Sequence, residues 1–365
     1  MTALDESWWA RVLGGPGGEL HNASSSERYV VLPRASEPRV VVDHDDSQAL
    51  RDALERYVDN RTSARGARSI AGGAAAVLAR RRPTWSVAAS GPTLREYLSE
   101  VLGVEVRLSV AVGPPRPNLK PVVRCYSKNR LVAVAKLGPD PHTAELVDND
   151  ALWLEEMIAS PLSGVETPQL FHHGRYGDSA ILVMAALDLE SERSMGLDEV
   201  PNEVIQEFSQ RYAEPRTLLD ETWFPELMAR VDRQDLASVA AQVAQVRRDP
   251  MLLDLAVTAW HGDWSPWNMG QLRNGKLCVW DWERAAVGTP AGFDLLHLHF
   301  QYGDGLDAAT DALIGIGVPA KHHRLIKMLY LFELCARHGE ADVIGGEKHA
   351  RVLAELDRVR ELATT

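Results

Sequence analysis

Cysteine is scarce in this sequence. Among 365 residues there are three cysteines, Cys125, Cys278 and Cys335, and no two of them form a Cys-x-x-Cys pair. A sparse, odd count argues against a disulfide framework and is typical of a reducing compartment. We therefore expect free thiols and a cytoplasmic protein.

Long apolar runs are also missing. The first twenty residues carry early acids and lack the apolar core of a signal peptide. No stretch approaches the roughly 18 apolar residues that a membrane helix needs. The sequence predicts a soluble chain with no membrane partner.

Positive charge is in short supply. Lys and Arg number 39 against 51 Asp and Glu, which gives a formal net charge of -12. General nucleic-acid binding is disfavoured, because neutralising phosphates needs a basic surface. The acidic balance suits a cationic substrate and equally suits plain solubility. The one basic concentration, six arginines at 61–82, is interpreted as a solvated face or loop, with a phosphate-contacting surface as the alternative.

The signature sequences of two classes of kinase are absent. No Walker A sequence occurs, which excludes a P-loop kinase. Neither His-Arg-Asp, Asp-Phe-Gly nor Ala-Pro-Glu occurs, so a eukaryotic-type protein kinase is disfavoured.

The chain is long enough for two lobes, and its patterning divides at about residues 100 and 188. Residues 1–100 are the least informative part, with strand patterns at 29–32 and 39–42 and a helical pattern at 47–58. Residues 101–188 favour a small antiparallel sheet carrying one helix, with a Lys128-Asn129 turn between two strands and a buried strand at 180–187. Residues 189–365 favour helices, including 237–247, 327–337 and the C-terminal segment. We predict an α+β fold with an N-terminal extension.

The strongest signal is the segment AWHGDWSPWNMGQLRNGKLCVWDWE at 259–283. Asn274-Gly275 predicts a hairpin turn of the type I′ class. That hairpin brings Asn268 and Asp281 to the same end of a ribbon, and Asp263 precedes Asn268 by five residues. Carboxylate and amide oxygens suit Mg²⁺, which binds few protein groups and keeps positions for phosphates and water. Mere turn capping by Asp263 and Asn268 is the less interesting alternative.

Phosphoryl transfer requires such a set of groups together with a lysine that holds the phosphates. Lys136 is the candidate, because it ends the apolar strand LVAVAK and its ammonium would emerge at a sheet end. An ordinary edge-strand lysine is the alternative interpretation.

HGDWSPWN followed by VWDWE resembles the HxDxxxxN and (I/V)DWE signatures of the aminoglycoside and choline kinase-like phosphotransferases, distant relatives of protein kinases. The resemblance covers roughly residues 104–365. It implies a bilobal protein-kinase-like fold that uses ATP and Mg²⁺. In this interpretation Asp263 is the catalytic base or hydroxyl-orienting group, and Asn268 and Asp281 are the metal ligands.

The resemblance also implies further roles. Lys136 would contact the α- and β-phosphates, with Asp150 and Met184 also among the nucleotide-binding residues. His261 would brace the catalytic loop, and Asp294 would be architectural. Glu283 would support the loop or touch the site.

The sequence departs from the family at two places. A kinase-type helix normally offers glutamate to the strand lysine, whereas here Asp150 lies in phase, with Glu145 as the alternative partner. No G-x-G-x-x-G covers the phosphates. GPPRPNLKP stands in its place, where Arg116 or Lys120 could replace backbone N–H contacts with charge.

Three functions remain open. The first is transfer of the γ-phosphate to a hydroxyl of a small molecule that resembles an aminoglycoside, a sugar or an amino alcohol. The second is the same chemistry on Ser or Thr of a precursor peptide. The third is a catalytically silent kinase fold that binds a nucleotide or a partner. Trp264 or Trp267 could stack on a substrate, and acids between Glu190 and Glu226 could attract a cation, although packing and solvation explain both.

Overall fold

The structure of this chain is a computed structural model. It describes residues 4–21, 27–59, 84–113, 118–190, 195–213, 217–233, 239–303, 305–341 and 346–361. The arginine-rich stretch at 61–82 and the predicted phosphate contact Arg116 lie outside these residues. Within them, no helix combines the length and the apolar character that crossing a bilayer requires.

The chain divides into two compact units. The first comprises residues 1–151 and 168–187, and the second comprises residues 152–167 and 188–365. Residues 1–100 and the predicted sheet that follows them thus belong to the same unit.

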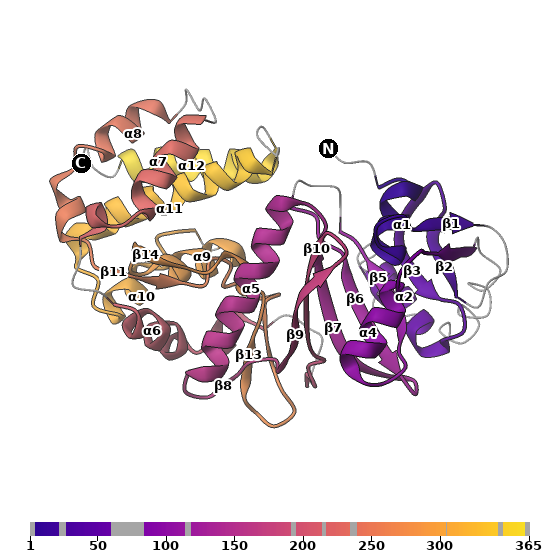
Figure 1. The fold of residues 1–365 in the computed structure, drawn as a ribbon. Coiled ribbons are helices and arrows are strands. Elements are labelled where there is room, and N and C mark those ends of the chain that lie inside the picture. The colour runs from indigo at the N-terminus through magenta and orange to yellow at the C-terminus, as the bar shows by residue number, and fades with distance from the viewer. Residues whose placement is uncertain are drawn as a thin grey trace. The chain divides into compact units, whose positions relative to one another are not determined.

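The first unit is built on one sheet, whose described strands follow the order β1-β4-β2-β3-β5-β6-β7-β10-β9 (Figure 1). Neighbouring strands run antiparallel. The strands are β1 (Glu19–His21), β2 (Arg28–Arg34), β3 (Glu37–Asp43), β4 (Thr84–Ala88), β5 (Arg107–Ala111), β6 (Val122–Ser127), β7 (Arg130–Gly138), β9 (Leu170–Tyr176) and β10 (Ser179–Ala185). Because β3 pairs with β5, the N-terminal strands continue the sheet of residues 107–185.

Helices cover both faces of this sheet. The helices are α1 (Glu6–Gly14), α2 (Ser47–Asp59), α4 (Leu94–Leu102) and α5 (Pro141–Ala159), whose last eight residues belong to the second unit. Side chains alternate along a strand. Tyr29 and Val31 therefore pack with α1 and α4, whereas Val30 and Leu32 pack with α2.

Local sequence explains how two of these helices begin. Asp5 accepts a hydrogen bond from the N–H of Trp8 at the start of α1. Thr93 and Glu96 form a capping box at the start of α4, and Gly103 ends that helix in the left-handed region. Each device satisfies backbone groups that a helix end leaves unpaired.

The second unit is mainly helical, as predicted. Its helices are α6 (Asn202–Arg211), α7 (Trp223–Arg233), α8 (Ala240–Val246), α9 (Phe293–Tyr302), α10 (Thr310–Gly315), α11 (Ala320–Glu340) and α12 (Glu347–Glu361). The short 3₁₀ helices are η1 (Leu197–Glu199), η2 (Leu218–Asp220), η3 (Pro250–Asp254) and η4 (Trp282–Arg284). The strands are β8 (Val165–Glu166), β11 (Val257–Trp260), β12 (Met269–Gln271), β13 (Leu277–Val279) and β14 (Ala286–Pro290). β11 pairs with β14, and β13 lies between β12 and β8.

One predicted turn differs in type, and another is confirmed. The hairpin at Asn274-Gly275 exists, but its turn is not of type I′. Gly275 has φ 82°, and its N–H donates to the carbonyl of Leu272. Asn274 does not have a positive φ, because among the described non-glycine residues a positive φ occurs at Lys128, Asn129 and Asp281. A type I′ turn needs positive φ at both central residues. That condition holds at Lys128-Asn129, between β6 and β7.

The strand β9, which contains His172 and His173, was not predicted from the sequence. The strand lies at the edge of the sheet and alternates between half-buried and exposed residues. An edge strand of this kind carries polar residues that weaken its strand signal. His172 contacts the hydroxyl of Tyr97 at 2.8 Å, and His173 contacts Asp148 at 2.7 Å.

Candidate functional site

The loop after β11 is held by His261. The N–H of Asp263 donates to His261 Nδ1 at 3.2 Å, and His261 Nε2 lies 3.1 Å from the carbonyl oxygen of Trp280. Nδ1 must therefore be unprotonated, and Nε2 carries the hydrogen. Complete burial lowers the pKa of His261 to about 4, so the ring is neutral at neutral pH. This neutral tautomer joins the loop to the strand end that precedes Asp281.

Asp294, at the start of α9, holds the main chain of the same loop. Its carboxylate accepts the N–H of His261 at 2.8 Å and the N–H of Gly262 at 3.3 Å. Burial raises the pKa of Asp294 to about 7, although the two amides act in the opposite direction. These contacts support an architectural role for Asp294.

Gly262 leaves no space for a side chain. Its φ is 85°, and an added Cβ would lie 2.2 Å from the carbonyl oxygen of Arg284. Its own carbonyl oxygen accepts a hydrogen bond from Arg337 Nη1 of α11 at 2.5 Å. The glycine of HGD is therefore required by close backbone approach.

Asp263 presents a carboxylate that is held but not enclosed. Oδ1 lies 2.9 Å from His297 Nε2, and Oδ2 accepts from Asn268 Nδ2 at 2.9 Å. Burial on its own would raise the pKa of Asp263, but the hydrogen bond from His297 leads the opposing effects that outweigh it, and the pKa lies well below its usual range. Its side chain is 28% exposed, so the ionised group can be reached by another molecule.

The hairpin brings Asn268 and Asp281 together as predicted. Met269 of β12 faces Val279 of β13, and the N–H of Trp280 donates to the carbonyl of Asn268 at 3.0 Å. Asp281 follows immediately and adopts the left-handed region, with φ 69° and ψ 51°. Aspartate tolerates this conformation better than most residues, and such backbone outliers concentrate at functional sites.

The donor set fits a divalent cation. Asn268 Nδ2 is engaged by the main-chain oxygen of Asp263 at 3.0 Å as well as by its carboxylate. The amide nitrogen is thus committed to donation, and the amide oxygen points elsewhere. One carboxylate and one amide oxygen are a suitable protein contribution to a Mg²⁺ site, because this ion keeps waters and phosphate oxygens as its other ligands.

The tryptophans of this segment differ in accessibility. Trp264 and Trp282 are buried and pack with His261 and Phe208. Trp267 is 50% exposed. Trp267 is therefore accessible for the predicted stacking on a substrate, whereas Trp264 is not.

In the first unit, Lys136 and Asp150 form a buried pair. Lys136 Nζ of β7 lies 2.5 Å from Asp150 Oδ2 of α5, and their side chains are 12% and 2% exposed. Glu145, the alternative partner, is exposed. The shorter acid therefore does reach the lysine. Met184 is buried in β10, whose pairing with β7 places it opposite Val134.

The loop after β5 is attached to the N-terminal strands. The N–H of Val112 donates to the carbonyl of Arg39, and Arg39 Nη1 donates to the carbonyl of Gly113 at 3.0 Å. Gly113 begins the segment that stands where the family has its glycine-rich loop. Lys120, at its other end, is half-buried.

Two residues beside Asp263 were not predicted from the sequence, namely His297 and Arg337. His297 follows Asp294 by three residues, so both side chains face the same side of α9. That spacing is the signal that could have identified it. Arg337 lies 74 positions after Asp263 and has no comparable local signal.

A separate groove of about 1010 Å³ lies in the second unit. Its lining includes the acids Glu190, Asp198, Glu199 and Glu203. Part of the predicted acidic surface thus borders a groove.

Comparison with known proteins gives the fold of the chain. No family model matches the sequence, and no curated protein matches it. Among solved structures, aminoglycoside phosphotransferase APH(4)-Ia, a thermostable mutant in its apo form, is 13% identical with a TM-score of 0.54, covering 74% of this chain and 100% of that one. LicA in complex with AMP is 15% identical with a TM-score of 0.53, covering 73% and 96%. Choline kinase LicA from Streptococcus pneumoniae in another crystal structure is 15% identical with a TM-score of 0.48, covering 67% and 90%. The predicted protein-kinase-like fold is confirmed.

Proposed function

We propose that this chain is an ATP- and Mg²⁺-dependent phosphotransferase that transfers the γ-phosphate to a hydroxyl of a small molecule. The observation that carries the proposal is the arrangement of Asp263 and Asn268. An ionised, partly exposed carboxylate is held by two donors, and the amide oxygen beside it is left for a cation. The fold shared with LicA and an aminoglycoside phosphotransferase supports the same chemistry.

Asp263 is the group that receives the acceptor hydroxyl in this proposal. Its exposed lone pairs accept the O–H, orient the oxygen and take up the proton as transfer proceeds. In phosphoryl transfer the transition state is loose, so orientation contributes more than strong basicity. A carboxylate with a lowered pKa suits that task.

The cofactors would be held by the other predicted residues. Asn268 and Asp281 supply oxygen ligands to Mg²⁺, which when bound neutralises charge on the phosphates. Lys136, oriented by Asp150, supplies the positive charge for the α- and β-phosphates. The closeness of this pair argues against a catalytically silent fold, because the main departure from the family does not abolish the contact.

The acceptor is proposed to be a small hydroxylated molecule. The formal net charge of -12 makes positively charged acceptors, such as amino alcohols and amino sugars, the first class to screen. A Ser- or Thr-containing peptide is the second class, and none of the contacts described above favours it.

Calorimetry tests the cofactor part of the proposal. We expect wild-type protein to bind ATP with Mg²⁺ and much more weakly with EDTA, because the metal links the nucleotide to Asp281. Asp281→Asn should lose the Mg²⁺-dependent part of the ATP affinity. Asp311→Asn, at an exposed site on α10, should retain it. Equal binding with and without Mg²⁺ would contradict the metal assignment.

A further inference from the structure

His297 lies on the same helix face as Asp294 and is 3% exposed. Asp294 holds the main chain of the catalytic loop, whereas His297 contacts the side chain of Asp263. One turn of α9 thus contacts both parts of the loop. The resemblance to known phosphotransferases assigns a role to Asp294 but none to His297, which contacts the Asp263 carboxylate.

The direction of this hydrogen bond is fixed by its partners. An ionised carboxylate can only accept, so His297 Nε2 must carry a hydrogen and donate it to Asp263 Oδ1 at 2.9 Å. His297 Nδ1 lies 3.0 Å from the hydroxyl of Tyr330, a fully buried residue of α11. With the hydrogen on Nε2, Nδ1 is left to accept a hydrogen bond from the Tyr330 hydroxyl, which selects this tautomer.

The Tyr330 hydroxyl agrees with this direction, whereas the contact of Gln301 agrees with it only after its amide is turned. Burial raises the pKa of Tyr330 well above 10, so its hydroxyl keeps the proton that it donates. Gln301 Nε2 lies 3.4 Å from His297 Nε2, which is long for a hydrogen bond, and two donors cannot bond to each other. Gln301 can share the His297 proton only with its amide turned so that the oxygen faces the ring.

We infer that His297 is a positioning residue for phosphoryl transfer, which acts through Asp263 and is itself set by Tyr330. The inference rests on the proposed function. His297 at Oδ1 and Asn268 at Oδ2 fix the plane of the carboxylate from two separate elements. The remaining lone pairs then have a defined direction toward the acceptor hydroxyl.

The expected effect of removing His297 follows from this geometry. A misplacement of about 1 Å in a reacting group costs on the order of 100-fold in rate. His297→Leu should therefore lower kcat by about 10- to 100-fold. The KM for Mg-ATP should not change, because His297 contacts none of the residues assigned to the nucleotide or metal.

The matched variants separate positioning from packing. His297→Gln keeps a donor that can reach Asp263 Oδ1, and it should recover most of the lost kcat. His299→Leu is the control on the same helix, because side chains two residues apart point about 160° apart around the helix axis. In an Asp263→Ala background, His297→Leu should cause no further loss of turnover, since residues that act as a unit are not additive.

We would measure kcat and KM for Mg-ATP turnover, the Mg-ATP dissociation constant and the urea midpoint for each variant. A His297→Leu protein with wild-type kcat would overturn the inference, and so would a His297→Gln protein no better than His297→Leu. Additional loss in the Asp263→Ala background would also overturn it. If His297→Leu fails to fold, Tyr330→Phe takes its place, with an expected loss of about fivefold in kcat, equivalent to one hydrogen bond.

A readout independent of turnover is the ¹⁵N spectrum of the His297 ring. We expect hydrogen on Nε2 in the wild type and also in Tyr330→Phe, because the ionised carboxylate of Asp263 can only accept. A wild-type ring with hydrogen on Nδ1 alone overturns the inference while the proposed function stands. A wild-type protein that binds no Mg-ATP overturns both, because the inference rests on the function.

Discussion

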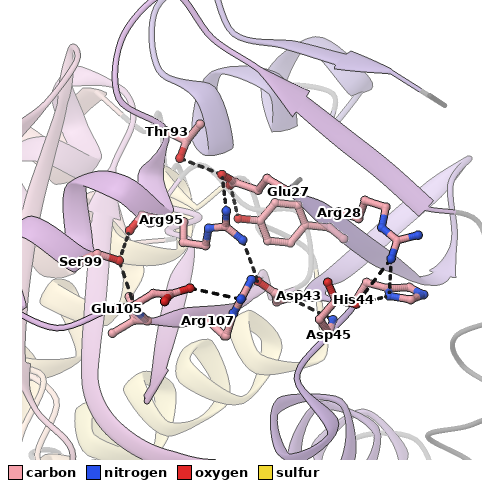
Figure 2. Close-up of polar contacts among 12 residues, drawn as sticks. Glu27, Arg28, Asp43, His44, Asp45, Thr93, Arg95, Ser99, Glu105 and Arg107 are labelled. Carbon is pink, nitrogen blue, oxygen red and sulfur yellow. Dashed lines mark hydrogen bonds and ion pairs between the residues drawn. The ribbon is translucent and has the colours of Figure 1, made fainter. Parts of the chain in front are cut away.

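Two buried polar networks, one in each unit, differ in how their carboxylates are compensated. In the first unit, Arg95 lies 3.4 Å from both Glu27 and Asp43, whose side chains are 6% and 1% exposed (Figure 2). Arg107 of β5 also contacts Asp43. In the second unit, Asp263 is held by a histidine and an amide and is 28% exposed.

The difference separates a structural network from a functional one. Glu27 also accepts from the hydroxyls of Tyr29 at 2.6 Å and Thr93 at 3.0 Å, so its charge is enclosed by donors from its own unit. Asp263 keeps part of its hydrogen-bonding capacity for another molecule. A charge that is buried and fully paired fixes a fold, whereas a held but open charge is available for chemistry.

Replacing the shared arginine is expected to have the largest effect on stability. Arg95→Met leaves Glu27 and Asp43 buried without their common cation, which should cost about 3–5 kcal/mol in the free energy of unfolding. Urea denaturation followed by tryptophan fluorescence measures it, because Trp9 and Trp85 lie in the core of the same unit. Arg34→Met, at an exposed pair with Glu37, is the control. Equal midpoints for the two variants would contradict the structural interpretation.

The Lys136–Asp150 pair is an intermediate case, because it is buried and is also assigned to the nucleotide. Asp150→Glu introduces the longer acid that was expected from the resemblance to kinases, yet it adds a methylene at a position that is 2% exposed. We expect a loss of about 1–3 kcal/mol in stability from overpacking. Thermal or urea unfolding of Asp150→Glu and the wild type measures this loss of stability. A glutamate variant as stable as the wild type would show that the helix can move to accept it.

The second network depends on a neutral His261, so its stability should depend on pH. Burial holds the folded pKa of His261 at about 4, below the ordinary value of 6.5. As the pH falls below 6.5 the unfolded chain binds the proton first, and stability is lost until about pH 4. Between pH 7 and pH 5 the wild type should lose about 2 kcal/mol more than His261→Asn. Parallel urea titrations at both pH values measure the difference, and equal losses would contradict the neutral assignment.

The smallest expected effect is at Trp267. Trp267→Ala should cost about 1 kcal/mol in the free energy of unfolding, because half of this side chain is exposed. Trp264→Ala, at a side chain that is 1% exposed, should cost about 3–5 kcal/mol. The same denaturation assay compares them. If Trp267→Ala weakens binding of an acceptor while stability is retained, Trp267 belongs to the acceptor surface.

Local patterns explain what could be predicted from the sequence. The hairpin around Asn274 and the helix that contains Asp150 follow from spacing and turn chemistry within a few residues. The companions of Asp263 depend on packing between segments far apart in the chain, as with Arg337 and Tyr330 of α11. No local period reports such contacts. The Glu27–Arg95–Asp43 network was missed for the same reason, because its members are 16 to 68 positions apart.

Turnover of Mg-ATP by wild type and Asp263→Ala tests the central claim most directly. We expect both proteins to bind Mg-ATP with similar affinity, because Asp263 is assigned to the acceptor. The variant should lose about 10²- to 10⁴-fold in turnover, the contribution typical of a positioned acid–base group. Asp311→Ala, at an exposed position, should behave as wild type. Undiminished turnover by Asp263→Ala would contradict the assignment of the catalytic group and, with it, the proposed function.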